Sequence, residues 1–566
     1  METFGKGSHT GRGTSATLAR VGRYSPGLIA ICLLILGILA SSLLAASPGI
    51  PLVTTATTAT VTTSPASSVL AVSGHGWGHG LGLSQWGAYG YAKRGWTFDR
   101  ILGHYYSGTT RGPAKVAAVR VLLASAKKTT IESTAAWTVV DAAGTKVPLD
   151  PGVLKLTPKL AIADHPELQP PFKLVGKQPL IVDQVPYRGT LNVSSDGKLV
   201  QVIDTVGLES YLKAVVPAEM PSSWLPEALK AQAVAARSYA LANLATGRPF
   251  DLYGDTRSQV FGGVKVENPA TSAAVDATKG QVVLYKGKVA NTLFFSTSGG
   301  RTASAFESTG INVPYLVPVA DPYDTASPYH DWGPVLFDAA SVAKQFKLAS
   351  SIADVQTLTG PSGRVKSLVV VSDDESQVKM NGNQVRGALE LRSTWFTPML
   401  LQLLPASKTM TYGGAISLTG SARGADLVSL ESKPFGLDWA PAGELLLDAN
   451  GTFSTIVRPQ VGTQYRLAWG NVRAGLTKIA VAVSVDGTVQ QGTATGKTKP
   501  VAAFAATQLQ WSPDGITGWA TVASSTTDAA GAYTISALAP EMTGMYRVRI
   551  APGHGLAAGV SKPACC

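Results

Sequence analysis

A glycine-rich segment near the N-terminus places the tightest limit on how this chain can fold. The segment SGHGWGHGLGLSQWGA, residues 73–88, has glycine at every second position from Gly74 to Gly82 and contains His75 and His79, two of the chain's seven histidines. Glycine loses more conformational entropy on folding than any other residue, so such a segment becomes ordered only where it makes extensive contacts. A metal site, a phosphate-binding loop and a polar loop packed against a larger surface are all compatible with it.

The chain begins with a targeting pattern. In residues 1–47, basic residues precede an uncharged apolar run at about residues 28–46, which is long for a signal peptide and close to the length of a membrane-spanning helix. A cleaved signal peptide and a retained signal anchor both stay open. In either case we expect the bulk of the chain to be exported, to the extracellular cell wall or to a membrane-anchored position facing the wall. The Thr/Ala-rich residues 48–70 are expected to form a linker, because their composition cannot build a core.

Composition and charge narrow the class of partner. A length of 566 residues predicts about two to four domains, and the 59 glycines with only 15% charged residues suit a compact, strand-rich protein. The formal net charge of +12 would suit a polyanion, but the basic residues are scattered and no nucleic-acid recognition motif appears. Anionic polymers of a cell wall are therefore the expected partner, and nucleic acid is not. The three cysteines, Cys32, Cys565 and Cys566, predict no disulfide framework.

The clearest helix of the sequence follows in the middle of the chain. The segment WLPEALKAQAVAARSYALANLA, residues 224–245, has an alanine-rich interior that allows close approach of neighbouring backbone, so we expect a central, packed helix. At 100° per residue Lys230 and Arg237 fall on one stripe of it and Gln232 on the other. A shorter helix is predicted around Ile101.

Beyond about residue 405 the chain repeats itself. The stretch DANGTFSTIVRPQVGTQYRL from Asp448 corresponds to DAAGAYTISALAPEMTGMYRV from Asp528, an offset of about 80 residues. Short alternating strands with this period predict two tandem β-sandwich-like modules, at residues 405–487 and 488–566. Such modules more often bind or space than catalyse.

One glutamate just before the alanine-rich helix is a candidate general acid. In GLESYLKAVVPAEMPSSW, residues 207–224, Glu219 lies between Pro217 and Met220 in an apolar context. Burial of a carboxyl in such surroundings raises its pKa and suits it to donate a proton. The alternative is structural: a glutamate that caps the following helix or pairs with Lys230.

A resemblance bears on this choice. The stretch LESYLKAVVPAEMPSSWLPEALKAQAVAARSYAL closely resembles the signature of the family of stage II sporulation protein D and the amidase enhancer LytB, the SpoIID/LytB family. Similar shorter stretches are PYRGTLNV at 186–193, DTRSQVFGG at 255–263, FFSTSGGRT at 294–302, PYLVPVADPYD at 314–324 and NQVRGALELRSTWF at 383–396. The resemblance implies a SpoIID-like α+β core domain at residues 113–404, between the N-terminal signal or anchor segment and the all-β modules.

The resemblance implies one of two activities. Sporulation protein D is a lytic transglycosylase that cleaves peptidoglycan glycan strands lacking their peptides, whereas LytB enhances a wall amidase. The family's catalytic glutamate falls on Glu219, and its cleft residues fall on Lys230, Gln232 and Arg237. In lytic chemistry one carboxyl is enough, because the sugar's own C6 hydroxyl replaces the attacking water, while hydrolysis normally uses two carboxylates. The cations would bind the lactyl carboxylates of muramic acid.

The same resemblance gives the glycine-rich segment a role. Residues 74–109 are similar to a motif that sporulation protein D carries near its C-terminus, so the order is permuted here. We expect residues 71–112 to pack on the core, with His79 and Gln85 offering polar contacts to sugar and Ser298 of the FFSTSGG stretch as a further substrate-binding candidate.

No metal and no cofactor are expected. The histidines of the segment have no cysteine or carboxylate near them in sequence, and the segment lacks the Gly-Lys-Ser/Thr ending of a phosphate-binding loop. Where some family members carry a Cys/His zinc cluster, this chain has Tyr253, Arg257 and Ser258. The expected partners are thus peptidoglycan glycan strands, a wall amidase in the alternative function, and a membrane if the N-terminal segment is retained.

Overall fold

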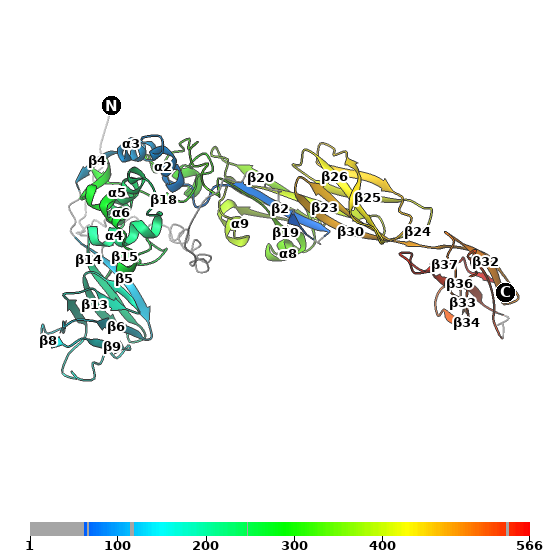
Figure 1. Cartoon of the computed structure of the whole chain (residues 1–566), viewed down its shortest axis with the longest axis horizontal. Helices are drawn as coiled ribbons and strands as arrows, with labels where there is room; N and C mark the ends of the chain where they lie inside the picture. The colour runs from blue at the N-terminus through cyan, green and yellow to red at the C-terminus, as the bar shows by residue number, and fades with distance from the viewer. Residues whose placement is uncertain (1–61, 65–66, 114–117, 246, 539–542, 566) are drawn as a thin grey trace, which may run out of the picture. The chain divides into compact units, whose positions relative to one another are not determined.

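The computed structural model describes residues 62–64, 67–113, 118–245, 247–538 and 543–565 (Figure 1). The described part has mixed architecture, with eight α-helices, α2 to α9, among many strands, and none of these helices is long and apolar enough to cross a membrane. The signal or anchor segment expected at residues 1–47 lies outside the described residues. The described residues divide into two compact units: unit 1 contains those within 118–222 and 239–280, and unit 2 contains the other described residues.

Unit 1 is built on two sheets whose inward faces share one core. A seven-stranded sheet has the order β15-β5-β14-β13-β10-β7-β8, and a four-stranded sheet has the order β12-β11-β6-β9. Apolar residues of both sheets, such as Val139 and Val202 in the first and Ile131 and Leu180 in the second, belong to a single buried cluster. The strands are β5 (Ala118–Ala126), β6 (Thr129–Ser133), β7 (Trp137–Val140), β8 (Lys146–Leu149), β9 (Gly152–Leu156), β10 (Phe172–Gly176), β11 (Leu180–Val182), β12 (Val185–Tyr187), β13 (Thr190–Ser195), β14 (Val200–Gly207) and β15 (Leu252–Tyr253).

The helices of unit 1 follow strand β14. They are α4 (Leu208–Glu219), the short 3-10 helix η1 (Val264–Val266) and α6 (Pro269–Ala277), and the long helix α5 (Pro226–Ala242) contributes residues to both units. Every residue of α5 from 231 to 238 is buried, which confirms the expected central, packed helix. Gln232 and Arg237, expected on opposite stripes of the helix, both have fully buried side chains.

Unit 2 contains the remaining sheets and helices. Its helices are α2 (Gln85–Ala92), α3 (Phe98–Tyr105), α7 (Ala305–Thr309), α8 (Ala339–Gln345) and α9 (Gly382–Ala388), and α3 confirms the short helix predicted around Ile101. Its strands are β1 (Thr62–Thr63), β2 (Ser68–His75), β3 (Leu83–Ser84), β4 (Thr110–Pro113), β16 (Gln281–Tyr285), β17 (Lys288–Val289), β18 (Phe294–Phe295), β19 (Asp331–Asp338), β20 (Ile352–Thr359), β21 (Val365–Ser372), β22 (Gln377–Asn381), β23 (Phe396–Pro405), β24 (Thr409–Thr411), β25 (Ile416–Ala422), β26 (Val428–Pro434), β27 (Ala440–Leu445), β28 (Thr452–Val457), β29 (Thr463–Trp469), β30 (Val472–Ala482), β31 (Ser484–Gln490), β32 (Thr493–Lys499), β33 (Ala506–Ser512), β34 (Ala520–Thr526), β35 (Ala532–Ser536), β36 (Met545–Ala551), β37 (Gly559–Val560) and β38 (Ala564–Cys565).

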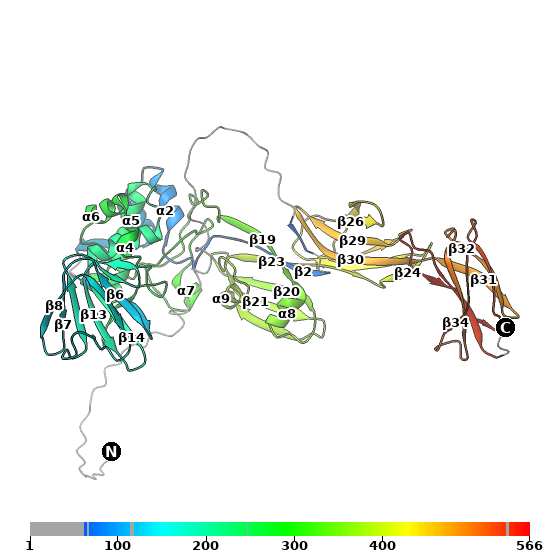
Figure 2. The ribbon, with the colours of Figure 1, turned by 60° about the horizontal axis from the view of Figure 1, so that its bottom comes forward.

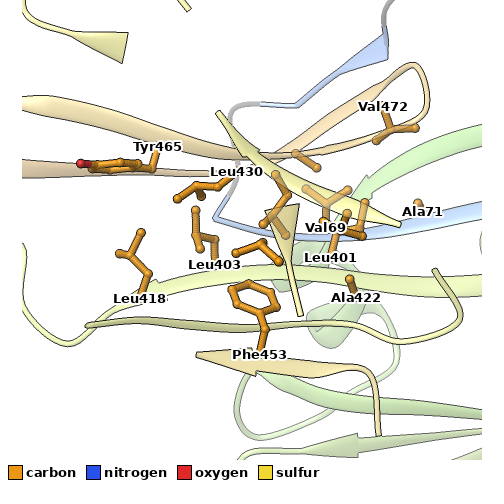
Figure 3. Packing of buried hydrophobic residues seen from close by; sticks show 14 of the residues in the cluster. Val69, Ala71, Leu401, Leu403, Leu418, Ala422, Leu430, Phe453, Tyr465 and Val472 are labelled. Carbon is orange, nitrogen blue, oxygen red and sulfur yellow. The ribbon is translucent and has the colours of Figure 1, made fainter. Parts of the chain in front are cut away.

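Strand β2 is buried on both faces. Val69 and Ala71 belong to the core shared with β25, β28 and β29 (Figure 3), whereas Leu70 and Val72 belong to a second core with α8, α9 and the sheet β20-β21-β22. Alternation of side chains along a strand makes this possible. Figure 2 shows the ribbons of β2, α8, α9, β20 and β21 in this part of unit 2. The strand begins at Ser68, so the last residues of the expected linker belong to a sheet.

The first C-terminal module shares its core with earlier parts of the chain. The sheet order β19-β2-β23-β25-β28 joins β2 and β23 to strands of the module, and Val69 lies opposite Leu401 in the β2–β23 pairing. Leu401 and Leu403 pack with Leu418 and Phe453 in the same cluster, as Figure 3 shows. The core of this module therefore begins before residue 405. Sequence alone hides this, because the pairing of β2 with β23 joins strands far apart in the chain.

The sequence repeat corresponds to a repeated local structure. The carboxylate of Asp448 accepts hydrogen bonds from the backbone of Asn450 and Thr452, and that of Asp528 does the same for Ala530 and Ala532. The glycine of each turn adopts a positive φ, 72° at Gly451 and 73° at Gly531, which favours glycine there. An arginine also covers a tryptophan ring in each copy: Arg466 lies 3.9 Å from the ring centre of Trp439, and Arg547 lies 4.1 Å from that of Trp519.

The glycine-rich segment packs against residues 293–300 and 320–323 of unit 2. A Cβ atom added at Gly76 would lie 2.6 Å from the carbonyl oxygen of Thr297, and one added at Gly90 would lie 1.8 Å from that of Tyr323. Trp77 and Thr297 exchange backbone hydrogen bonds of 2.8 and 3.0 Å. The glycines are thus required by close approach of backbone to backbone, and the entropy lost in ordering them is offset by this contact.

We predict that Gly90→Ala destabilises the protein by about 1–3 kcal/mol, because the new methyl group collides with the carbonyl of Tyr323. The matched control is Gly103→Ala in helix α3, where a Cβ atom meets nothing within 4 Å and alanine stabilises a helix by up to about 1 kcal/mol. Thermal unfolding of both variants tests the prediction. A melting temperature for Gly90→Ala equal to that of the control would contradict the close packing.

We predict that a chain ending at residue 405 is strongly destabilised and one ending at residue 482 is not. The shorter chain uncovers Val69, Leu401 and Leu403, and each large apolar side chain exposed costs about 1.5–3 kcal/mol. The longer chain keeps the whole cluster. Thermal unfolding and binding of an apolar dye distinguish the two chains, and equal behaviour would show that the module is separable at residue 405.

Candidate functional site

Glu219 is the last residue of helix α4 and is half-buried. The helix forms because Leu208, Tyr211, Leu212 and Val215 repeat at helical spacing and are buried on one face. At Met220 the backbone becomes extended, with φ −130° and ψ 141°, and the helix ends. Glu219 is therefore held at the carboxyl end of a rigid helix.

A buried tyrosine lies in the electrostatic neighbourhood of Glu219. The hydroxyl of Tyr211 is fully buried and donates a hydrogen bond of 3.1 Å to Oε1 of Gln259. Burial, followed by the charges of Tyr239 and Glu219, raises the pKa of Tyr211 well above its usual value. The charge of Glu219 is thus near enough to the Tyr211 hydroxyl to act on its pKa.

Helix α5 carries the three residues that the family resemblance assigns to the cleft. Lys230 is partly exposed, and its Nζ lies 2.7 Å from Oε1 of Glu227, whose other oxygen accepts the backbone N–H of Phe98. The sequence left open a structural role in which Glu219 pairs with Lys230. In the structure Lys230 pairs with Glu227 instead. This places an ammonium group at the surface, held by its neighbour one turn earlier.

The other two residues of α5 lie in the interior. Nη1 of Arg237 donates a 3.2 Å hydrogen bond to the carbonyl of Gln281, the first residue of β16. The amide of Gln232 is fully buried, and neither of its polar atoms has a hydrogen-bond partner among the described residues. A buried polar group without a partner is costly, so Gln232 is a strained feature of the helix.

His79 is held by the protein itself. Its Nδ1 accepts the backbone N–H of Leu81 at 3.0 Å, and its ring packs 5.4 Å from that of Phe295. Burial, with a smaller contribution from the charge of Arg386, lowers the pKa of His79 to about 4. The imidazole is therefore neutral at pH 7. Gln85, the first residue of α2, is also buried.

Ser298 belongs to a buried polar cluster. Its hydroxyl is fully buried and donates a 2.9 Å hydrogen bond to Oδ2 of Asp324, and the backbone N–H of Gly299 donates to the same oxygen at 2.7 Å. The other oxygen of Asp324 lies 2.6 Å from Nδ1 of His330. In this structure Ser298 thus positions a carboxylate, and its hydroxyl does not face solvent.

A second buried carboxyl lies beside this cluster. Asp321 is fully buried, and burial together with the charge of Asp324 raises the pKa of Asp321 to about 7. Asp321, Asp324 and His330 did not stand out in the sequence, although the first two lie in the family-like stretch PYLVPVADPYD. The spacing of Asp321 and Asp324, three positions apart, was the sequence feature that could have indicated this cluster. Their proximity to the glycine-rich helix α2 depends on tertiary packing that no local pattern encodes.

The positions at which some family members carry a zinc cluster contact one another. The guanidinium of Arg257 lies 3.8 Å from the ring centre of Tyr253 and 2.6 Å from a carboxylate oxygen of Asp255. The hydroxyl of Ser258 accepts the backbone N–H of Tyr253. Within the described part of the chain, no group of three or more histidine, cysteine, aspartate or glutamate side chains is arranged to hold a metal ion.

Comparison with known proteins shows which family the middle of the chain is similar to. Residues 196–285 match the family model described as SpoIID, Stage II sporulation protein. This match confirms the resemblance to the SpoIID/LytB family over this part of the chain. The matched range contains Glu219, Lys230, Gln232 and Arg237.

Three relatives show how far the similarity extends. An uncharacterized protein of Brachyspira hyodysenteriae is 41% identical over 135 residues, which cover 23% of this chain and 37% of the relative. The amidase enhancer of Bacillus subtilis is 42% identical over 113 residues, covering 20% of this chain and 15% of the relative. Stage II sporulation protein D of Bacillus amyloliquefaciens is 32% identical over 212 residues, covering 34% and 60%. The chain thus spans less than two thirds of each of these relatives.

We predict that His79→Ala destabilises the protein by about 1–3 kcal/mol, whereas His75→Ala changes its stability by less than about 1 kcal/mol. His79 loses internal bonds, while His75 is partly exposed and pairs with the exposed Asp331. Thermal unfolding at pH 7.5 measures both.

The pH dependence follows from the lowered pKa of His79. A group whose pKa is depressed on folding contributes stability above its unfolded value of 6.5, and this contribution is lost as the pH falls toward about 4. The difference in stability between the wild type and His79→Ala should therefore narrow across that window. A constant difference would show that the pKa of His79 is not lowered in the folded protein.

Proposed function

We propose that this chain is an exported cell-wall protein that cleaves peptidoglycan glycan strands by lytic transglycosylation, with Glu219 as general acid and then general base. The observation that carries the proposal is the position of Glu219, half-buried at the carboxyl end of helix α4 beside Tyr211. The negative end of the helix dipole favours the protonated carboxyl at such a position, as a proton donor requires.

One carboxyl accounts for the whole reaction. Glu219 donates its proton to the glycosidic oxygen, and the bond between that oxygen and the anomeric carbon breaks. The C6 hydroxyl of the same muramic acid then attacks the anomeric carbon while the Glu219 carboxylate accepts its proton. A 1,6-anhydro ring closes, no water is consumed, and the acid is regenerated.

The residues of α5 take different parts in this proposal. Lys230 is the cation at the surface, suited to bind a lactyl carboxylate of muramic acid. Arg237 acts from the interior as a positioning residue, because its guanidinium holds the backbone of Gln281. Gln232, with its unpartnered amide, would gain hydrogen bonds if substrate or water reached it.

A second candidate function is modulation of a wall amidase without catalysis. The observation that favours it is the similarity to a relative named amidase enhancer, the highest identity among the three relatives described above. The two candidates differ in whether purified chain alone cuts glycan.

We predict that Glu219→Gln lowers turnover of purified, peptide-free glycan strands by about 10²-fold or more, since it removes the transferable proton and keeps the shape of the side chain. The matched control is Glu132→Gln on strand β6, a partly buried glutamate in the same unit. Mass spectrometry of the products should show 1,6-anhydro ends for the wild type and for the control.

Two outcomes would contradict the assignment. Equal turnover by Glu219→Gln and the wild type would exclude Glu219 as the catalytic acid. Absence of cleavage by the wild type, together with stimulation of a wall amidase, would establish the second candidate.

A further inference from the structure

Three aromatic side chains form a cluster on the outward face of the glycine-rich segment. Trp86 and Tyr89 lie three residues apart on helix α2, and Trp224 precedes helix α5. The ring of Tyr89 is stacked on that of Trp224, with centroids 4.8 Å apart and an interplanar angle of 23°, and the ring of Trp86 meets Trp224 edge-on at 4.8 Å. We call Trp86, Tyr89 and Trp224 the aromatic platform.

The two sides of helix α2 differ in how far their side chains are buried. Gly87, Ala88 and Gly90 are buried, and a Cβ atom at Gly87 or Gly90 would collide with the residues beneath. Trp86 and Tyr89 are only partly buried, as is Trp224. Trp86 and Tyr89 therefore lie on the more exposed side of the helix, whereas the packed side carries small residues together with the buried Tyr91.

The polar atoms of the platform are available to a ligand. The indole N–H groups of Trp137 and Trp332 each donate to a backbone carbonyl, at 3.0 and 2.9 Å, as is usual for tryptophans with a structural role. Among the described residues, no hydrogen bond joins the indole N–H of Trp86 or Trp224, or the hydroxyl of Tyr89, to another side chain or to the backbone.

The chemistry of the platform suits a sugar ring. A pyranose of the gluco series has a face of axial C–H groups that lies flat on an aromatic ring, while its hydroxyl and acetamido groups point outward to polar partners. Half-exposed tryptophan and tyrosine supply both a flat apolar surface and a hydrogen-bonding edge. Lys93, one turn further along α2, places its Nζ 5.5 Å from the ring centre of Tyr89, and its ammonium can meet the carboxylate of a muramic acid.

The platform is close in sequence to the proposed catalytic residue. Trp224 follows Glu219 by five positions in the continuous stretch EMPSSW. The same chain segment therefore ends the catalytic helix and supplies one ring of the platform.

We propose that the aromatic platform is a sugar-stacking subsite for the N-acetylated glycan strand, to which the glycine-rich segment contributes Trp86 and Tyr89. The nature of the glycan rests on the proposed function. The subsite itself rests on the geometry of the three rings, two of which belong to helix α2. The sugar contacts expected from His79 and Gln85 stay a separate prediction.

Binding of chitohexaose to the full chain tests the proposal. All variants carry Glu219→Gln so that binding is measured without turnover. Isothermal titration should show that Trp86→Ala and Tyr89→Ala each weaken binding about tenfold or more, while Trp86→Phe retains most of the affinity because a flat ring remains. The matched control is Phe504→Ala, an aromatic residue that is 72% exposed in the second C-terminal module; its affinity should be unchanged.

The outcomes separate the subsite from the proposed function. Chitohexaose affinity unchanged in Trp86→Ala and Tyr89→Ala, with melting temperatures also unchanged, would overturn the subsite even if the wild type cleaves glycan. If binding depends on the platform but the wild-type chain cleaves no glycan, the subsite is supported and the proposed lytic function is wrong. If Trp86→Ala proves unstable, the comparison of Trp86→Phe with Tyr89→Ala decides, because both keep the helix packing of Gly87 and Gly90.

Discussion

The two-sided burial of strand β2 is the constraint on which the structure of unit 2 depends. Val69 and Ala71 complete the core of the first C-terminal module, and Leu70 and Val72 complete the core beneath α8 and α9. A strand that supplies both cores cannot shift by one residue without exchanging its two faces. Its position therefore fixes where the following glycine-rich segment begins, at Gly74, and directs that segment against residues 293–300.

The glycines of that segment serve packing and not chemistry. Backbone contacts with Thr297 and Tyr323 leave no space for side chains at Gly76 and Gly90. The two histidines also have partners within the protein: His79 is neutral and bonded internally, and His75 pairs with Asp331 at the surface. Of the three possibilities that the sequence left open for this segment, the packed loop agrees with these contacts. The chemistry that the segment offers to solvent lies in Trp86 and Tyr89.

Local features were predictable from the sequence, and long-range pairings were not. The alanine-rich helix α5, the short helix α3 and the repeated Asp-Gly turns at Asp448 and Asp528 depend on residues close together in the chain, so their patterns were sufficient. The pairing of β2 with β23 joins residues more than three hundred positions apart, and no local sequence pattern predicts it. For the same reason the burial of Ser298 against Asp324 could not be foreseen, nor could the burial of both Gln232 and Arg237, which lie on opposite stripes of the packed helix.

The central claim is that Glu219, acting without an attacking water, cleaves the glycan by transfer to the sugar's own hydroxyl. The most direct test is digestion of peptide-free glycan strands in heavy-oxygen water, followed by mass spectrometry of the newly formed ends. The account predicts that no heavy oxygen enters the products, because the 1,6-anhydro ring closes with an oxygen already in the sugar. Incorporation of one heavy oxygen atom for each bond cleaved would identify hydrolysis and contradict the account.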